Sequence, residues 1–254
     1  MDFTLKKYEE LLKVIIQNRI PVFTIEQWIA TQPKQGIVLR HDVDRKAKNA
    51  LAVAKLEHKY SIKSTFYFRI TKNSFKPDII EEIAGLGHEI GYHYEDLSLA
   101  GGDYDKAIKL FQVHLKMFEP FAKVMTIAMH GRPLSKYDNR DLWKKFDFRN
   151  FGLIGEAFLS IDYSDMYYFT DTGRNWDVSK SNLRDKVLCK VPEEIVKSTD
   201  HLIRLIINNQ NCNFALIIHP ERWNNTLANW IAYFFIDHFV NLIKQIIKLG
   251  RRKK

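Results

Sequence analysis

The sequence predicts a single α/β domain built on parallel strands. Along its 254 residues, short apolar runs alternate with amphipathic stretches of helical length, the pattern of strands joined by crossover helices. No repeat, low-complexity segment or Pro/Gly-rich linker divides the chain, so we expect one domain spanning residues 1–254. A chain of this length can bury a sizeable core.

The apolar runs give the expected order of elements. We expect strands at 36–41, 64–69, 87–92, 124–129, 151–155, 166–170 and 214–218. We expect helices at 3–18, 45–59, 77–85, 104–118, 139–145, 193–208 and 227–249. Pro77 marks a natural helix start, and Gly85 and Gly87 mark the end of the same helix.

Every expected strand ends on, or is followed by, a side chain that can bind a metal, transfer a proton or carry charge. These side chains are, in strand order, His41, Asp42 and Asp44; Arg69; His93, Glu95 and Asp96; His130 and Arg132; Glu156; Asp171; and His219. The carboxyl ends of parallel strands gather on one face of an α/β fold, where active sites lie. The sequence therefore predicts a functional site on that face.

The first strand ends on two carboxylates, Asp42 and Asp44, with one residue between them. Residues two apart on a strand point to the same side, so these carboxylates face the same way and His41 faces the other. Like charges held this close share a proton or flank a cation. Asp44 could also cap the helix that follows, and His41 could be a packed structural residue.

Imidazoles from later strands extend this pattern. One Asp with His93 and His130 would leave coordination positions open for water, as in catalytic zinc sites. The second Asp would then be free to act as general base on that water. His219, after the last strand, is the candidate general acid.

Composition bounds the setting of the protein. The net charge of +9 comes from scattered lysines and arginines, and the only basic run is the tail Arg251–Lys254. We therefore do not expect a nucleic-acid partner, whereas a phosphate-bearing substrate or an anionic membrane surface fits the charge. Cys189 and Cys212 match no metal spacing and are expected to be reduced thiols, with a cytoplasmic location.

The last expected helix is unusually apolar. Residues 227–254 combine Trp230, Phe234, Phe235 and Phe239 with the basic tail. This segment either packs against the domain or rests on the inner face of a membrane as an amphipathic helix. Asp237 and His238 in its middle argue against a membrane-spanning helix.

Four motifs occur in a characteristic order: LRHDVD, STFYFR, GHEIGYH and LIIHPERW. Together they resemble the motifs of the polysaccharide deacetylases, the NodB-homology fold of carbohydrate esterase family 4, over about residues 35–220. The resemblance implies an irregular NodB-type (β/α)7 barrel with parallel strands. It also implies that Asp42 is the catalytic base, that Asp44 and His93 bind the metal, and that His219 is the acid.

Two further motifs match the family loosely. HGRP gives Arg132 as the equivalent of the arginine that steadies the base, and TGRNWD, with Trp176 and Asp177, corresponds to the Trp/Asp motif. The family's second metal histidine would lie four residues after His93, where this chain has Leu97.

That departure leaves the third metal ligand to His130, Glu95 or Asp96, and we favour His130. The resemblance implies a divalent metal, zinc first, with cobalt, manganese and iron as alternatives.

The function implied is metal-dependent removal of an N-acetyl or similar acyl group from a sugar. The LRHDVD and GYHYEDL forms of the motifs resemble a subgroup associated with surface-polysaccharide, O-antigen or lipopolysaccharide synthesis, so the expected substrate is a nucleotide-linked or lipid-linked amino sugar. The alternatives are an inactive carbohydrate-binding protein of the same fold and a metal-independent amide hydrolase.

Overall fold

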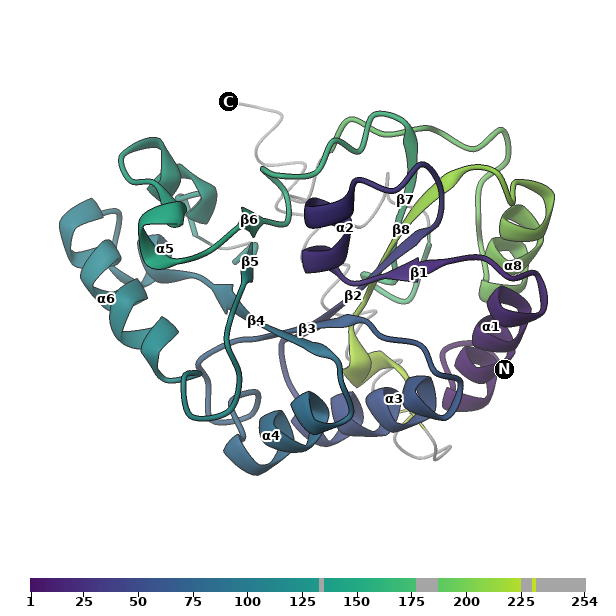
Figure 1. Ribbon diagram of the computed structural model, residues 1–254, viewed down its shortest axis with the longest axis horizontal. Helices are drawn as coiled ribbons and strands as arrows, with labels where there is room; N and C mark the ends of the chain where they lie inside the picture. The colour runs from purple at the N-terminus through teal and green to yellow at the C-terminus, as the bar shows by residue number, and fades with distance from the viewer. Residues whose placement is uncertain (133–134, 177–186, 225–229, 232–254) are drawn as a thin grey trace.

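Parallel strands form one curled sheet with helices around it (Figure 1). The computed structural model describes residues 1–132, 135–176, 187–224 and 230–231. The expected helix at 227–249 lies outside these residues except for Trp230 and Ile231, as do Asp177 and the basic tail. Within the described residues, all the strand pairings are parallel. The expected α/β fold with an irregular barrel of parallel strands is confirmed, and the sheet curls into a half-barrel.

The strand order places consecutive strands side by side over most of the sheet. The strands are β1 (Val22–Phe23), β2 (Ile37–Val43), β3 (Thr65–Phe68), β4 (Glu89–Tyr94), β5 (Thr126–Met129), β6 (Gly155–Glu156), β7 (Met166–Thr170) and β8 (Asn213–Ile218). Their order is β6-β5-β4-β3-β2-β8-β7, with β1 also paired to the start of β2. Strand β2 is therefore central, and β3 and β8 flank it.

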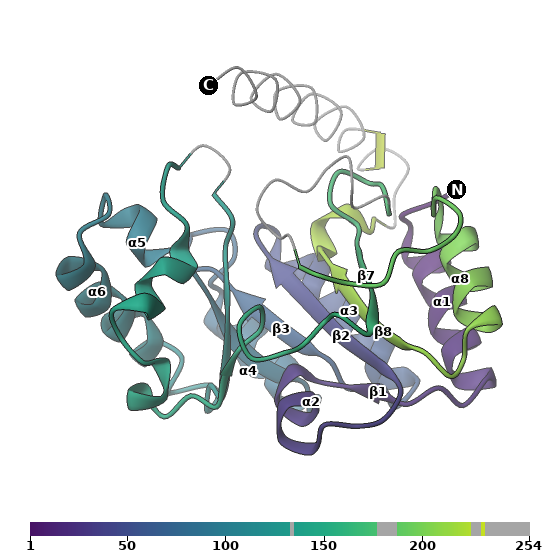
Figure 2. The same cartoon turned by 90° about the horizontal axis from the view of Figure 1, so that it is seen from above.

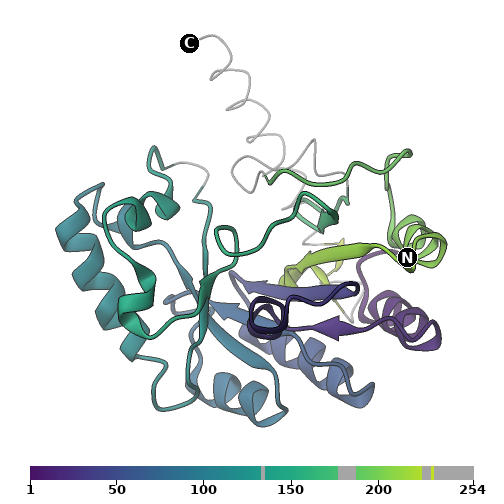
Figure 3. The same cartoon turned by 45° about the horizontal axis from the view of Figure 1, so that its top comes forward.

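Helices cover the outside and flanks of the sheet. They are α1 (Leu5–Gln17), α2 (Ile25–Thr31), α3 (Ala47–Lys59), α4 (Pro77–Gly85), α5 (Asp96–Leu99), α6 (Tyr104–Lys116) and α8 (Thr199–Asn208). Figure 2 shows α5 and α6 on one flank of the sheet and α1 and α8 on the other. In Figures 1 and 3, α3 and α4 lie beneath β2 and β3, whereas α2 lies on the opposite side of the sheet.

Strand β2 separates two kinds of environment because its side chains alternate between faces. Leu39 and Val43 belong to the large apolar core under the outer helices. Val38 belongs to a smaller inner cluster with Trp28 of α2 and Tyr67 of β3. The same alternation sends His41 to the outer side and Arg40 and Asp42 to the inner side.

Most expected elements are present with shifted ends. Strand β4 begins at Glu89 rather than residue 87 because Gly87 has a φ of +87°, a turn conformation that glycine adopts without strain. Helix α8 begins at Thr199 rather than at residue 193. Ser198 caps this start, because its side chain accepts a hydrogen bond from the His201 N–H. The expected helix at 139–145 is a 3₁₀ helix, Asn139–Lys144.

Two expectations about elements need correction. Of the expected strand at 151–155, Phe151 ends a second 3₁₀ helix, Phe148–Phe151, and only Gly155 lies in a strand, the two-residue β6. Gly152 follows the 3₁₀ helix with a φ of +77°, a left-handed conformation that interrupts an extended run. Helix α2 was not expected; it begins with a capping box in which Thr24 and Gln27 satisfy each other's backbone N–H groups.

No helix in the described part of the chain combines the length and the apolar character needed to cross a membrane.

Candidate functional site

The carboxyl ends of β2, β4 and β5 bring three of the predicted side chains together. Asp44 follows β2, His93 lies on β4 and His130 follows β5. The Asp44 Oδ1 atom lies 3.6 Å from His93 Nε2 and 3.4 Å from His130 Nε2. Residues His93 and Ala128 are register partners in the β4–β5 ladder, which is why the two imidazoles adjoin.

The other nitrogen of each imidazole is already used. His93 Nδ1 lies 2.9 Å from the carbonyl oxygen of Ala128, which can only accept, so Nδ1 carries the hydrogen. His130 Nδ1 lies 3.0 Å from Glu95 Oε2. Burial would raise the pKa of Glu95, but His130 and Arg69 lower it to about 2, so this carboxylate also accepts. With its hydrogen on Nδ1, the neutral ring of His93 turns an Nε2 lone pair toward Asp44, and the Nε2 atom of His130 faces the same carboxylate.

Asp44 therefore faces the Nε2 atoms of two imidazoles. Its Oδ1 atom is buried and has no hydrogen-bond partner. Burial lowers the pKa of His93 to about 4 against the opposing charges of Asp42 and Asp44, so His93 does not supply a positive charge beside Asp44 at neutral pH. A buried carboxylate oxygen that faces two imidazole nitrogens without a hydrogen bond is suited to a cation.

The donor set fits a divalent metal. Imidazole nitrogens and a carboxylate oxygen are the ligands of catalytic zinc, and the Ala128 carbonyl and Glu95 hold the rings as outer-shell partners commonly do. Among the residues described, no group of three or more His, Cys, Asp or Glu side chains is placed so that it could hold a metal ion as it stands. Asp44, His93 and His130 therefore supply ligands of the right chemical type, but their atoms do not surround an ion in this structure.

The other two candidates for the third ligand are engaged elsewhere. Glu95 binds Arg69 at 2.7 Å through one oxygen and His130 at 3.0 Å through the other, so both of its oxygens already have partners. Asp96 is fully buried beside Tyr92 and His114, 2.8 Å and 2.7 Å from their polar atoms. Of the three candidates, His130 is the one that lies beside Asp44.

Asp42 is held by an arginine that the sequence analysis did not single out. Arg40 Nε and Nη2 donate to the two Asp42 oxygens at 2.7 Å and 2.8 Å. Arg40 is 1% exposed and lies over the rings of Tyr67 and Phe158. Burial would raise the pKa of Asp42, but the charge and hydrogen bonds of Arg40 outweigh it and lower the pKa, so the carboxylate stays ionised.

Arg132, expected to steady Asp42, lies elsewhere. Its Nε atom is 3.4 Å from Glu95 Oε2, and its side chain is 39% exposed. The signal for Arg40 was present in the sequence, because residues two apart on a strand share a face and Arg40 stands two before Asp42.

His219 is oriented by Asp171 at the end of β7. His219 Nδ1 lies 2.7 Å from Asp171 Oδ1, and Asp171 also accepts from Arg222 and Trp223. Burial and Arg222 would lower the pKa of His219, but Asp171 outweighs them and raises it. The protonated form that a general acid needs is thereby favoured. Strands β7 and β8 are neighbours, which places Asp171 beside His219.

Glu221 is a further buried group at this face that the sequence analysis missed. It is 1% exposed, and neither carboxylate oxygen has a hydrogen-bond partner. Burial and the charge of Asp44 raise its pKa to about 7. The Nε atom of Arg45 lies 3.8 Å from Glu221 Oε1.

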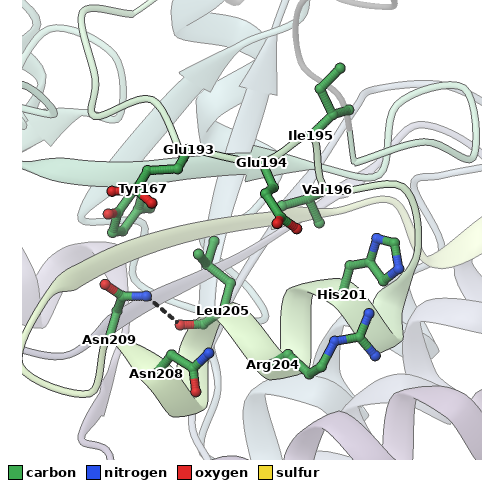
Figure 4. Close-up of a pocket in the computed structure, with 10 residues that line it drawn as sticks. All are labelled: Tyr167, Glu193, Glu194, Ile195, Val196, His201, Arg204, Leu205, Asn208 and Asn209. Carbon is green, nitrogen blue, oxygen red and sulfur yellow. Dashed lines mark hydrogen bonds between the residues drawn. The ribbon is translucent and has the colours of Figure 1, made fainter.

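A separate hollow lies between α8 and the chain that precedes it (Figure 4). Tyr167 in its lining lies on the outside of β7, against Phe214. Asn209 donates to the Leu205 carbonyl at 2.9 Å. None of the residues predicted for the site lines this hollow, so the candidate chemistry lies at the strand ends.

Comparison with known proteins gives similar solved structures only. No protein-family model and no curated protein matches this chain. A mutant of a CE4 family pseudoenzyme of Bacillus anthracis with restored enzymatic activity is 15% identical at a TM-score of 0.45, covering 85% of this chain and 64% of its own. This chain thus spans less than two thirds of that structure.

Two other structures are similar to the same degree. A candidate polysaccharide deacetylase of Mycobacterium smegmatis is 14% identical at a TM-score of 0.49, covering 83% of this chain and 84% of its own. A family 4 carbohydrate esterase of Bacillus anthracis is 13% identical at a TM-score of 0.43, covering 91% of this chain and 83% of its own. The functional assignment therefore depends on the geometry at the strand ends and on the motifs.

Proposed function

We propose that this chain is a metal-dependent hydrolase that removes an N-acetyl or similar acyl group from an amino sugar. One observation carries the proposal: the unpartnered Asp44 oxygen faces the Nε2 nitrogens of His93 and His130. The four motifs of the sequence resemble those of sugar deacetylases and supply the substrate class. Zinc is the first candidate metal, with cobalt, manganese and iron as alternatives.

The side chains divide the reaction between them. Asp44, His93 and His130 would hold the cation, which when bound polarises the acyl carbonyl and makes water a better nucleophile. Asp42, fixed by Arg40, takes a proton from the attacking water. His219 gives its proton to the departing amine, and Asp171 keeps the imidazole charged and correctly turned.

The setting of the reaction is also a proposal. The motif forms favour a nucleotide-linked or lipid-linked amino sugar of surface-polysaccharide synthesis, such as O-antigen, in the cytoplasm. Peripheral membrane contact would involve residues 227–254, which lie outside the described residues apart from Trp230 and Ile231.

The test begins with metal content. The purified chain, loaded in turn with zinc, cobalt, manganese and iron, should bind about one equivalent, as a site with three protein ligands does. Asp44→Ala and His93→Ala should lose it. His58→Ala is the matched control, because His58 lies on α3, away from the strand ends. Acetate release from N-acetyl sugars is then measured on each protein.

The outcomes separate the three interpretations. Metal binding with acyl release supports the deacetylase. Metal-free protein that binds sugars without releasing acetate indicates an inactive carbohydrate-binding protein. Acyl release that survives Asp44→Ala and a chelator indicates a metal-independent amide hydrolase.

A further inference from the structure

Beside the predicted metal site lies a cavity of about 420 Å³ with a strongly basic lining. Arg69, Arg132 and Lys136 line it, and among the described residues no carboxylate does. His130 lines it as well, so the cavity adjoins the side chain whose Nε2 atom faces Asp44. Any ligand group in this cavity would lie within one side chain of the reacting centre.

The two arginines are held in place rather than left to move in solvent. Glu95, whose side chain is 7% exposed, binds Arg69 through one oxygen at 2.7 Å and approaches Arg132 through the other at 3.4 Å. Three cations against this single carboxylate leave two positive charges at the cavity. Among the described residues, Lys136 has no ion-pair partner; its Nζ atom lies 5.1 Å from the ring centroid of Tyr137.

The opposite wall is also fixed. Asn139 is fully buried; its Nδ2 donates to the His130 carbonyl at 2.8 Å, and its Oδ1 accepts from the Ser98 N–H at 2.9 Å. Ser98 and Ser135 place their hydroxyl oxygens 2.9 Å apart in the lining. The cavity is thus built by the ends of β3 and β5, by α5 and by the segment before Asn139.

We infer that this cavity binds a phosphate group attached to the sugar, so that the substrate of the proposed hydrolase is a sugar phosphate or diphosphate ester. Arg69 uses Nε and Nη2 on Glu95, so the remaining N–H groups of the two guanidiniums, the Lys136 ammonium and the hydroxyl donors are what would contact phosphate oxygens. A phosphate carries about −1.5 to −2 charge near neutral pH, which matches the two uncompensated cations better than one carboxylate would. The inference rests on the proposed function for the identity of the sugar, and nucleotide and lipid diphosphates share this chemistry.

Binding of inorganic pyrophosphate to the metal-loaded chain tests the cavity directly. The affinity for pyrophosphate, measured by calorimetry, should fall about tenfold in Lys136→Glu, since a cation is replaced by an anion at contact distance. Lys109→Glu, which makes the same charge change on the exposed surface of α6, should leave affinity unchanged. Lys136→Met should give a smaller loss, and equal thermal midpoints should establish that the variants are folded.

Asp44→Ala separates the cavity from the metal, because pyrophosphate also binds metals. Affinity that persists in Asp44→Ala but is lost in Lys136→Glu supports the inference. Equal affinity in Lys136→Glu and Lys109→Glu overturns it.

Acyl release identifies the source of the phosphate. We expect kcat/KM for N-acetylglucosamine 1-phosphate to exceed that for N-acetylglucosamine by about a hundredfold, with Lys136→Glu removing most of the advantage. The uridine diphosphate and short-chain prenyl diphosphate conjugates then distinguish a nucleotide-linked from a lipid-linked substrate. Equal rates with the free sugar overturn the inference and leave the deacetylase standing. Lys136-dependent pyrophosphate binding without acyl release from any sugar does the reverse.

Discussion

Two clusters, each with one carboxylate and two histidines, lie on opposite faces of β2 and behave differently. On the outer side, Glu57 accepts from Tyr8 and from His41 at 2.8 Å and from Ser64 at 2.6 Å, with His88 Nδ1 3.7 Å away. On the inner side, Asp44 faces His93 and His130 with its Oδ1 atom unpartnered. Similar residue types give a carboxylate with three hydrogen-bond donors in one place, although His41 Nδ1 there is buried without a partner, and a carboxylate oxygen without any in the other.

The difference lies in which imidazole nitrogen carries the hydrogen. His41 turns its Nε2 toward Glu57, which accepts, so that nitrogen donates. His93 and His130 donate from Nδ1 to the Ala128 carbonyl and to Glu95, so that it is their Nε2 atoms that face Asp44. Composition and burial do not distinguish a metal site from a core network, whereas the partners of the second nitrogens do.

The largest effect is expected at Asp44. Asp44→Asn should abolish metal binding and reduce acyl release to background, because an amide is a poor ligand for zinc. Elemental analysis and acetate release measure both losses. Retention of about one equivalent of metal in this variant would mean that the ion is held by other groups.

Glu57→Gln should reduce stability without affecting metal binding. Removing the charge leaves Tyr8, His41 and Ser64 around a neutral amide, which should lower the free energy of unfolding by about 3 kcal/mol while metal content stays unchanged. Urea denaturation gives the first quantity and elemental analysis the second. Loss of metal in a folded Glu57→Gln protein would contradict the division into two clusters.

The pH dependence of stability should reveal His93 in the metal-free protein. Its folded pKa of about 4 lies below the unfolded value near 6.5, so the unfolded chain binds more protons between these limits. Stability from this group is complete above about pH 6.5 and is lost as the pH falls through about 4, on the order of 3 kcal/mol in total.

Urea midpoints across this range, compared between the native chain and His93→Asn, isolate the contribution of His93. Identical slopes in the two proteins would show that His93 is not buried in its neutral form. Added zinc should increase the loss at low pH, because protons compete with the metal for the same nitrogen.

The smallest effect is expected at Asp96, the unused candidate ligand. Asp96→Asn keeps one acceptor for Tyr92 or His114, so we expect a loss of about 1 kcal/mol in stability and no change in metal content. A matched measurement on Asp44→Asn provides the contrast. A clear drop in bound metal for Asp96→Asn would move the third ligand from His130 to the chain after β4.

The sequence predicted the residues at the centre of the site better than the residues that hold them in place. His130 could be placed beside His93 because ends of successive parallel strands adjoin, and the 166–170 strand has the bounds expected for it. The role of Arg40 could have been predicted from the same two-residue spacing on a strand that paired Asp42 with Asp44. The contact of Asp171 with His219 and the burial of Glu221 could not, because they depend on the placement of β7 beside β8 and on the turn after His219.

The periodicity of apolar residues did not predict the shortest elements. Helix α2 and the two-residue strands β1 and β6 contain too few residues for a period to emerge. The apolar residues at 151–154 suggested a strand, but Phe151 ends a 3₁₀ helix and the strand itself is confined to Gly155 and Glu156.

Glu95 joins what are otherwise two separate binding events. One of its oxygens approaches both His130 and Arg132, and the other binds Arg69. An anion that draws the arginines toward itself loosens or redirects the carboxylate that turns His130, and a cation on His130 acts back on the same carboxylate. Thermodynamic reciprocity then requires that whatever factor phosphate applies to metal affinity, the metal applies to phosphate affinity. A phosphorylated substrate would in this way influence how tightly its own cofactor is held.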